Sequence, residues 1–351
     1  MKLKERILEL DALRGIAALV VILYHYTTRY QEIFQHKEPM LFSFPIGNFG
    51  VQLFFIISGF AIYMTLSNTK SLKDFAIKRI IRLYPAYIIA VVLTFTLTHL
   101  YQLQGRMVSL INGIVNITML GGLLGVPYVD GVYWSLLVEM IFYVLIGILM
   151  LIGLLKKIEY ASIAWLAVCA IINVAQLITG GIKGGNLIGM LAITQFCNLF
   201  IAGIMFYKIK QSISKPLHHL IVGACLVYQF LFQGISSGLI VALFFLVFYL
   251  VVYNKLQFIA INPLTFLGFI SYALYLVHQN IGYIVINALE KNGFTNQIFI
   301  LVPITVSIVL AYLITRFIEK PVQSFALKAY NNVKFRPSVA KPATTENSLA
   351  K

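Results

Sequence analysis

Ten long apolar runs constrain this chain more than any other feature of its sequence. Each has about 17 to 26 residues, the length that an α-helix needs to cross the hydrocarbon core of a bilayer. Only 11% of the residues are charged, against about 25% in a soluble protein. The sequence therefore predicts an all-α polytopic membrane protein with about ten transmembrane helices. The runs cover residues 11–29, 47–66, 82–101, 132–155, 160–180, 187–208, 217–233, 237–254, 263–288 and 296–318.

Basic residues cluster beside alternate runs, and this sets the expected orientation. If both termini lie in the cytoplasm, 21 Lys and Arg residues fall in cytoplasmic segments and 5 in outer segments. This distribution follows the positive-inside rule. The net charge of +15 is thereby explained without a nucleic-acid partner. We expect both termini in the cytoplasm and contact with membrane lipid.

The expected domain organisation is simple. Residues 1–320 are predicted to form one integral-membrane domain, and residues 321–351, which are polar and basic, a disordered cytoplasmic tail. The three cysteines lie within apolar runs and lack metal-ligand spacing. We therefore expect neither a disulfide framework nor a metal site.

The first run places two chemically distinct side chains on one face. Arg14 and His25 are eleven residues apart, which is about 20° past three full helical turns and a rise of about 16 Å. A cation near the membrane edge and a histidine near mid-depth indicate a site that holds an anion at one end and does chemistry at the other. The alternative is that Arg14 anchors the helix and His25 is a hydrogen-bonded interior residue.

Two arginines three residues apart, Arg79 and Arg82, lie at the cytoplasmic edge of the third run on one helical face. An arginine fork matches a pair of phosphate oxygens better than a lysine does. Together with Arg14, these side chains are predicted to hold a nucleotide-like diphosphate. Ordinary anchoring by positive charge is the alternative.

Further polar residues lie inside the fourth and ninth runs. Glu139 is expected at a depth similar to that of His25, where a carboxylate would orient the imidazole as a general base. The alternative is a structural polar bridge between helices. In the ninth run, Tyr272 and Tyr275 are expected to present hydroxyl groups below His278 to a shared cavity, or else to form a packed polar core.

Five short motifs, in order along residues 9–321, resemble those of the acyltransferase-3 family of integral-membrane acyltransferases. The family's arginine-x10-histidine signature matches Arg14 and His25, and its Arg-x-x-Arg pattern matches Arg79 and Arg82. The motifs are LDALRGIAALVVILYH at 10–25, ISGF at 57–60, the Arg79 and Arg82 pair, YWSLLVE at 133–139 and SYALYLVH at 271–278.

The resemblance implies ten helices and transfer of an acyl group, commonly acetyl, from cytoplasmic acyl-CoA to a hydroxyl of an extracytoplasmic sugar. The expected donor is acetyl-CoA, and the expected acceptor is a surface polysaccharide such as an O-antigen, or a lipid-linked oligosaccharide. The expected location is the bacterial cytoplasmic membrane. Some members carry a secreted hydrolase-like domain, and the present chain resembles the stand-alone type.

The resemblance and the residues together suggest a role for each side chain. Arg14, Arg79 and Arg82 are expected to bind the CoA phosphates. His25 is expected to remove the acceptor's proton, which contributes about 10² to 10⁴ in rate.

The remaining candidates surround this base. Glu139 or Asp11 is expected to orient His25, and Trp134 and Ser135 to lie near the acceptor. Tyr272, Tyr275 and His278 are expected on the substrate side. Direct transfer and a covalent intermediate on His25, Ser135 or a tyrosine both stay open.

Two other classes of function are compatible with such a sequence. One is a transporter or flippase for a lipid-linked sugar that uses the intramembrane His and Glu as a proton relay. The other is a structural membrane partner of a glycan-synthesis complex, which leaves the polar residues of the first run unexplained.

Overall fold

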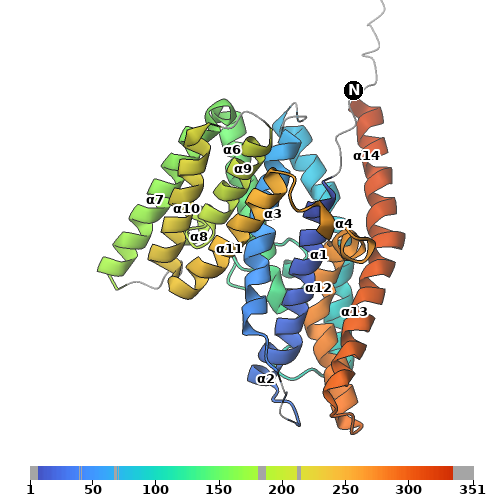
Figure 1. The fold of residues 1–351 in the computed structure, drawn as a ribbon. Coiled ribbons are helices and arrows are strands. Elements are labelled where there is room, and N and C mark those ends of the chain that lie inside the picture. The colour runs from blue at the N-terminus through green and yellow to red at the C-terminus, as the bar shows by residue number, and fades with distance from the viewer. Residues whose placement is uncertain are drawn as a thin grey trace, which may run out of the picture.

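The computed structural model describes residues 7–38, 40, 42–66, 69, 71–180, 187–211 and 215–334. All regular structure in these ranges is helical (Figure 1). Some of the basic residues in the orientation count, such as Lys70 and Lys183, lie outside the described residues. In the first half of the chain the helices are α1 (Leu8–Leu23), a π-helix η1 (Tyr24–Arg29), α2 (Tyr30–Ile33), the 3₁₀ helix η2 (Pro45–Phe49), α3 (Gly50–Leu66), α4 (Leu72–Leu100), α5 (Leu110–Asn116), η3 (Gly131–Tyr133) and α6 (Trp134–Leu151).

The second half adds the remaining helices. They are η4 (Leu154–Lys157), α7 (Ile158–Ile178), α8 (Leu187–Ala192), α9 (Cys197–Lys210), α10 (Pro216–Gln233), α11 (Ile235–Val252), η5 (Gln257–Ile259), α12 (Asn262–Lys291), η6 (Gln297–Ile300), α13 (Leu301–Ile314), a second π-helix η7 (Thr315–Glu319) and α14 (Lys320–Lys334). Every predicted run therefore corresponds to helix.

Eight helical stretches of the described chain are long and apolar enough to cross a membrane. The two other predicted runs correspond to α1, which has 16 residues before the π-helix, and to α10. The prediction of an all-α membrane protein is thus confirmed. The eight stretches are Pro45–Leu66, Leu72–Leu100, Gly131–Leu151, Leu154–Ile178, Leu187–Lys210, Ile235–Val252, Asn262–Lys291 and Gln297–Asn332.

The start of the predicted tail is helical instead of disordered. α14 continues the last membrane helix from Lys320 to Lys334. It is held at its base because Gln323 Nε2 donates hydrogen bonds to the carbonyl of Arg82 (2.9 Å) and to Glu319 (3.1 Å). The prediction is wrong for these residues, because local polarity concealed tertiary contacts with α4. The rest of the tail lies outside the described residues.

The centre of the molecule is the pairing of α1 with α12 (Figure 1). The two backbones meet at Gly15 and Gly268, where no side chain fits. A Cβ on Gly268 would lie 1.9 Å from the carbonyl oxygen of Asp11, and one on Gly15 would lie 2.4 Å from that of Leu264. Small residues at such crossings allow membrane helices to pack closely. This approach brings polar groups of α1 and α12 within reach of each other.

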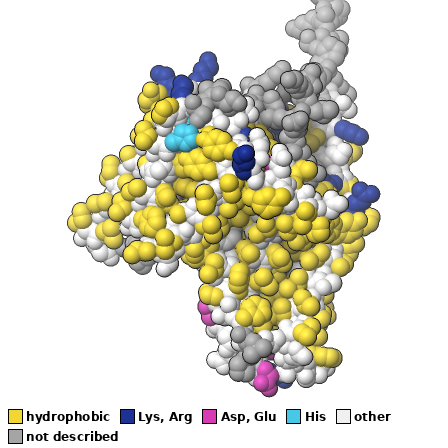
Figure 2. Space-filling model, in the orientation of Figure 1, with side chains coloured by type: hydrophobic (Ala, Val, Ile, Leu, Met, Phe, Trp, Pro, Cys, Tyr) yellow, Lys and Arg dark blue, Asp and Glu magenta, His cyan; other side chains and the backbone are white. Residues whose placement is uncertain are grey.

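The surface reflects the expected environment. Figure 2 shows hydrophobic side chains over most of the visible face, with Lys and Arg gathered toward the upper end and Asp and Glu toward the lower end. α1 begins and α14 ends toward that same upper end (Figure 1). Arg14 therefore lies nearer the basic end than His25 does.

Candidate active site

A cavity of about 140 Å³ lies among α1, α3, α4, α6 and α12. It contains all three arginines that the sequence predicts to act together. We call it the arginine cavity. The polar residues on its walls are Arg14, Ser58, Arg79, Arg82, Ser135, Glu139, Tyr143, Ser271, Tyr272 and Tyr275.

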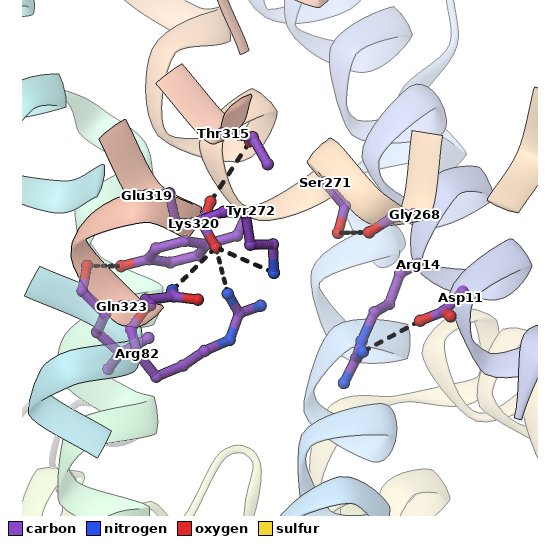
Figure 3. A network of polar contacts seen from close by, with 11 residues as sticks. Asp11, Arg14, Arg82, Gly268, Ser271, Tyr272, Thr315, Glu319, Lys320 and Gln323 are labelled. Carbon is purple, nitrogen blue, oxygen red and sulfur yellow. Dashed lines mark hydrogen bonds and ion pairs between the residues drawn. The ribbon is translucent and has the colours of Figure 1, made fainter. Parts of the chain in front are cut away.

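The three guanidinium groups are held differently. Arg14 Nη1 lies 3.5 Å from Asp11 Oδ1, and Arg82 Nη1 forms a very short ion pair with Glu319. Arg14 from α1 and Arg82 from α4 point into the same space (Figure 3). The cavity thus has a guanidinium group on each of two walls, each beside a carboxylate.

Arg79 has no carboxylate partner among the described residues. Its guanidinium carbon lies 5.7 Å from the ring centroid of Phe75 and 5.8 Å from that of Tyr143. Its Nη2 is 3.5 Å from Thr65 Oγ1, and its buried Nε has no hydrogen-bond partner in the described part of the chain. Arg79 therefore has hydrogen-bonding capacity left for an anion.

Glu139 belongs to the arginine cavity. Its Oε1 accepts hydrogen bonds from Ser58 Oγ (2.6 Å) and Tyr143 Oη (2.5 Å). Glu139 bonds to Ser58 of α3 and to Tyr143 of its own helix, and Asp11 lies 3.5 Å from Arg14, so an orienting role of Glu139 or Asp11 toward His25 stays a prediction without a described contact. Depth along a helix does not specify which neighbour a side chain faces.

The partner of His25 is His278. His278 Nε2 lies 3.1 Å from His25 Nδ1, and the ring centroids are 4.8 Å apart at 66°. Both residues are buried. Both histidines are candidates from the sequence, but their contact is not predicted by it.

The hydrogen-bond partners of His25 and His278 indicate which ring nitrogens carry hydrogen. His278 Nδ1 lies 2.9 Å from the carbonyl oxygen of Tyr275, and a carbonyl only accepts, so Nδ1 carries the hydrogen. In the neutral ring, His278 Nε2 is then an acceptor, and it receives the hydrogen of His25 Nδ1, which also faces the Val21 carbonyl at 2.9 Å. His25 Nε2 is consequently left with its lone pair, as a general base requires.

Tyr275 connects the arginine cavity to the histidine pair. It lines the cavity, and its ring centroid lies 5.7 Å from that of His278. Its hydroxyl is 2.7 Å from Ser135 Oγ and donates to the carbonyl of Val132 at 3.2 Å. Tyr272 lines the same cavity, as predicted, and donates to the Leu83 carbonyl at 2.9 Å.

Each π-helix carries one residue of this site. His25 lies in η1 and Glu319, the partner of Arg82, lies in η7. Single π-turns inside helices are rare and often occur at functional sites. Neither π-helix has a proline or glycine that would mark it in the sequence.

Two placements differ from the sequence-based picture. Trp134 lines a second cavity beside α3 and α6, whereas its neighbour Ser135 lines the arginine cavity. His36, which the sequence did not single out, is buried with its Nδ1 2.7 Å from Glu290 Oε1 and its Nε2 donating to the Tyr26 carbonyl at 3.0 Å. His36 therefore ties the loop after α2 to the end of α12.

Fold and site define a helical membrane protein in which a cationic cavity adjoins a buried histidine pair. Residues 7–316 match the acyltransferase-3 family, described as an acyltransferase domain. The chain belongs to this family. Among the described residues, no group of three or more His, Cys, Asp or Glu side chains is arranged to hold a metal ion.

Relatives with assigned names are distant. The chain is 25% identical over 374 aligned residues to the O-acetyltransferase OatA of Staphylococcus aureus strains NCTC 8325 / PS 47, COL and MRSA252. The match covers 92% of this chain and 58% of those proteins, so the chain spans little more than half of their length. No solved structure matches the chain.

Proposed function

We propose that this protein is a membrane O-acyltransferase that moves an acetyl group from cytoplasmic acetyl-CoA to a hydroxyl of an extracytoplasmic surface glycan. The observation that carries the proposal is the lone pair on His25 Nε2, which the hydrogen bonds of His278 leave free. Family membership and the similarity to O-acetyltransferases support acyl transfer to oxygen. The His–Glu proton relay of a transporter loses support, because Glu139 bonds to Ser58 and Tyr143.

The arginine cavity suits the phosphate groups of the donor. Three guanidinium groups and one carboxylate, that of Glu139, line its walls. Arginine binds phosphate through parallel N–H···O bonds, and Arg79 has donors available for them. Because Arg79 and Arg82 lie near the start of α4 together with Lys73 and Lys78, the positive-inside rule favours access for the donor from the cytoplasm.

The reaction itself takes place at His25 in this proposal. The pantetheine arm extends from the arginine cavity past Tyr275 and brings the thioester carbonyl to His25, about 16 Å further along the helix. His25 Nε2 takes the proton of the acceptor hydroxyl while the oxygen of that hydroxyl attacks the carbonyl carbon of the thioester. The tetrahedral intermediate then breaks its C–S bond, and the thiolate of CoA takes the proton from His25. The products are an ester and free CoA.

The experiment is a comparison of surface polysaccharide from cells with the wild-type protein, the His25→Gln variant or no protein. Gln keeps size and polarity without basicity at neutral pH. We expect O-acetyl mass increments and CoA-dependent labelling only with the wild type. Equal acetylation in all three samples would contradict the proposed function. If the wild type and the His25→Gln variant acetylate equally and the cells without the protein do not, the role of His25 is contradicted.

A further inference from the structure

A second cavity of about 450 Å³ lies on the other side of α3 and α6 from the arginine cavity. Val51 lines both cavities, and the adjacent residues Trp134 and Ser135 face one each. The walls of the second cavity come from η2, the first turns of α3 and α6, the segment before η3, and α8 with the segment that leads to α9. The mechanism proposed above does not use this cavity.

One end of the second cavity adjoins the segment that carries His25. Asn48, in η2, lines the cavity. The chain just before η2 is tied to η1, because the amide of Phe44 donates to the hydroxyls of Thr27 (3.1 Å) and Thr28 (2.8 Å). The second cavity and the π-helix of the proposed base are therefore connected through the segment of Phe44 and η2.

The walls combine aromatic rings with uncharged polar groups. The rings of Trp134 and Phe196 are 5.4 Å apart at 32°, and both line the cavity. No charged side chain lines it among the described residues. A phosphate or a carboxylate would therefore find no counter-ion on these walls.

Two buried polar atoms of residues that line the cavity have no partner in the described chain. They are Gln52 Oε1, an acceptor, and the hydroxyl of Thr194, a residue that is completely buried. Buried polar atoms in native proteins are nearly always hydrogen-bonded, so two on one cavity call for a ligand or ordered water with hydroxyl groups. An acyl chain would leave both unsatisfied.

We propose that this cavity binds one pyranose ring of the acceptor glycan. Trp134 and Phe196 contact the apolar face of the ring, and Gln52 and Thr194 bond to its hydroxyl groups. Pockets of this kind join aromatic walls to a few polar groups that set orientation. The inference rests on the proposed function, and it names the substrate class and the place where that substrate binds.

The test uses purified full-length protein in lipid nanodiscs and defined probes. The probes are the methyl pyranosides of glucose, galactose, rhamnose and N-acetylglucosamine, with decanoate as the apolar competitor. Binding is followed by tryptophan fluorescence, and Trp134→Phe identifies the signal of Trp134 because the chain has only 2 tryptophans. We expect at least one pyranoside to saturate the Trp134 signal in the millimolar range.

Variants then test the polar contacts. Thr194→Val and Gln52→Leu each remove one hydrogen-bonding group at nearly constant size, so each is expected to weaken pyranoside binding about tenfold. Thr305→Val is the matched control, because Thr305 is exposed on α13 and bonds only to its own helix at Leu301. Its affinity should equal that of the wild type. Melting curves confirm that each variant is folded.

The outcomes separate this inference from the proposed function. If decanoate saturates the Trp134 signal and no pyranoside does, or if neither Thr194→Val nor Gln52→Leu changes affinity, the sugar site is rejected. CoA release from acetyl-CoA is measured on the same samples. Release without a pyranoside response rejects the sugar site alone, whereas a pyranoside response without release for any acceptor rejects acyl transfer alone.

Discussion

His278 Nε2 accepts the hydrogen of His25 Nδ1 across 3.1 Å, and the same His278 ring is fixed by the backbone carbonyl of Tyr275. A histidine that acts as a base needs one nitrogen protonated and oriented so that the other is free. In the proposed mechanism a second histidine provides the orientation that a carboxylate provides in many enzymes. The contact links helices that are 253 residues apart in the chain.

Replacing His278 separates orientation from basicity. His278→Phe removes the acceptor, and we expect kcat to fall about 10²-fold with an unchanged KM for acetyl-CoA. His278→Gln keeps a side-chain acceptor and is expected to recover part of the rate. The measurement is CoA release at varied donor concentration. Equal losses in both variants would show that His278 acts only through packing.

Removing Arg79 should weaken donor binding without loss of stability. Arg79→Ala is expected to raise the KM for acetyl-CoA about 10- to 100-fold, because a hydrogen bond to a charged group contributes about 1.5–3 kcal/mol. The rate at saturating donor and the melting temperature should not change, since Arg79 has no described carboxylate partner. Lys73→Ala, an exposed cation on the same helix, is the control. An unchanged KM for Arg79→Ala would contradict the phosphate site.

Removing Arg82 should instead lower stability. The Glu319 side chain is 1% exposed, and Arg82, which is 40% exposed, is its main cation. We expect Arg82→Gln to destabilise the protein by about 1–3 kcal/mol because Glu319 is left without that partner. The double variant with Glu319→Gln should recover most of this loss. Thermal melting in detergent makes the comparison, and additive losses would argue against the pair.

Asp130 should make stability depend on pH. It precedes the fourth predicted span, and burial raises its pKa to about 7, although the amides of Asn280 and Val132 and the charge of Arg106 lower it. The folded state thus binds the proton of Asp130 more tightly than the unfolded state does. The contribution of this proton to the free energy of unfolding is full below about pH 4 and is lost as the pH rises through 7. Relative to Asp130→Asn, the wild type should lose melting temperature between pH 5 and pH 8. A parallel pH profile for the two proteins would contradict this.

The sequence was sufficient for the helices and for the arginine cavity. Apolar length alone located the eight described stretches that are long and apolar enough to cross a membrane, because a bilayer leaves the backbone few other structures. Arg14, Arg79 and Arg82 line one cavity. The expected depth of each residue in the membrane was enough to predict this, because all three were placed near the basic edge. Ser135, Tyr272 and Tyr275 line the same cavity.

The contacts of His25 required the structure. Glu139 was expected near its depth and His278 on the substrate side, and the rotation of α6 and α12 about their axes decides which side chain His25 meets. That rotation depends on packing such as the Gly15–Gly268 crossing, which a single sequence does not specify. The π-turn at Tyr24–Arg29 shifts the helix face locally and has no sequence marker. His36 was missed for a similar reason, because its partner Glu290 is 254 residues away.

The rate of CoA release by purified wild-type and His25→Gln protein, with acetyl-CoA and a glycan acceptor at neutral pH, tests the role of the His25 base most directly. We predict acceptor-dependent release by the wild type and a rate about 10² to 10⁴ lower for His25→Gln, with the same KM for acetyl-CoA. Full acceptor-dependent release by His25→Gln would contradict the account.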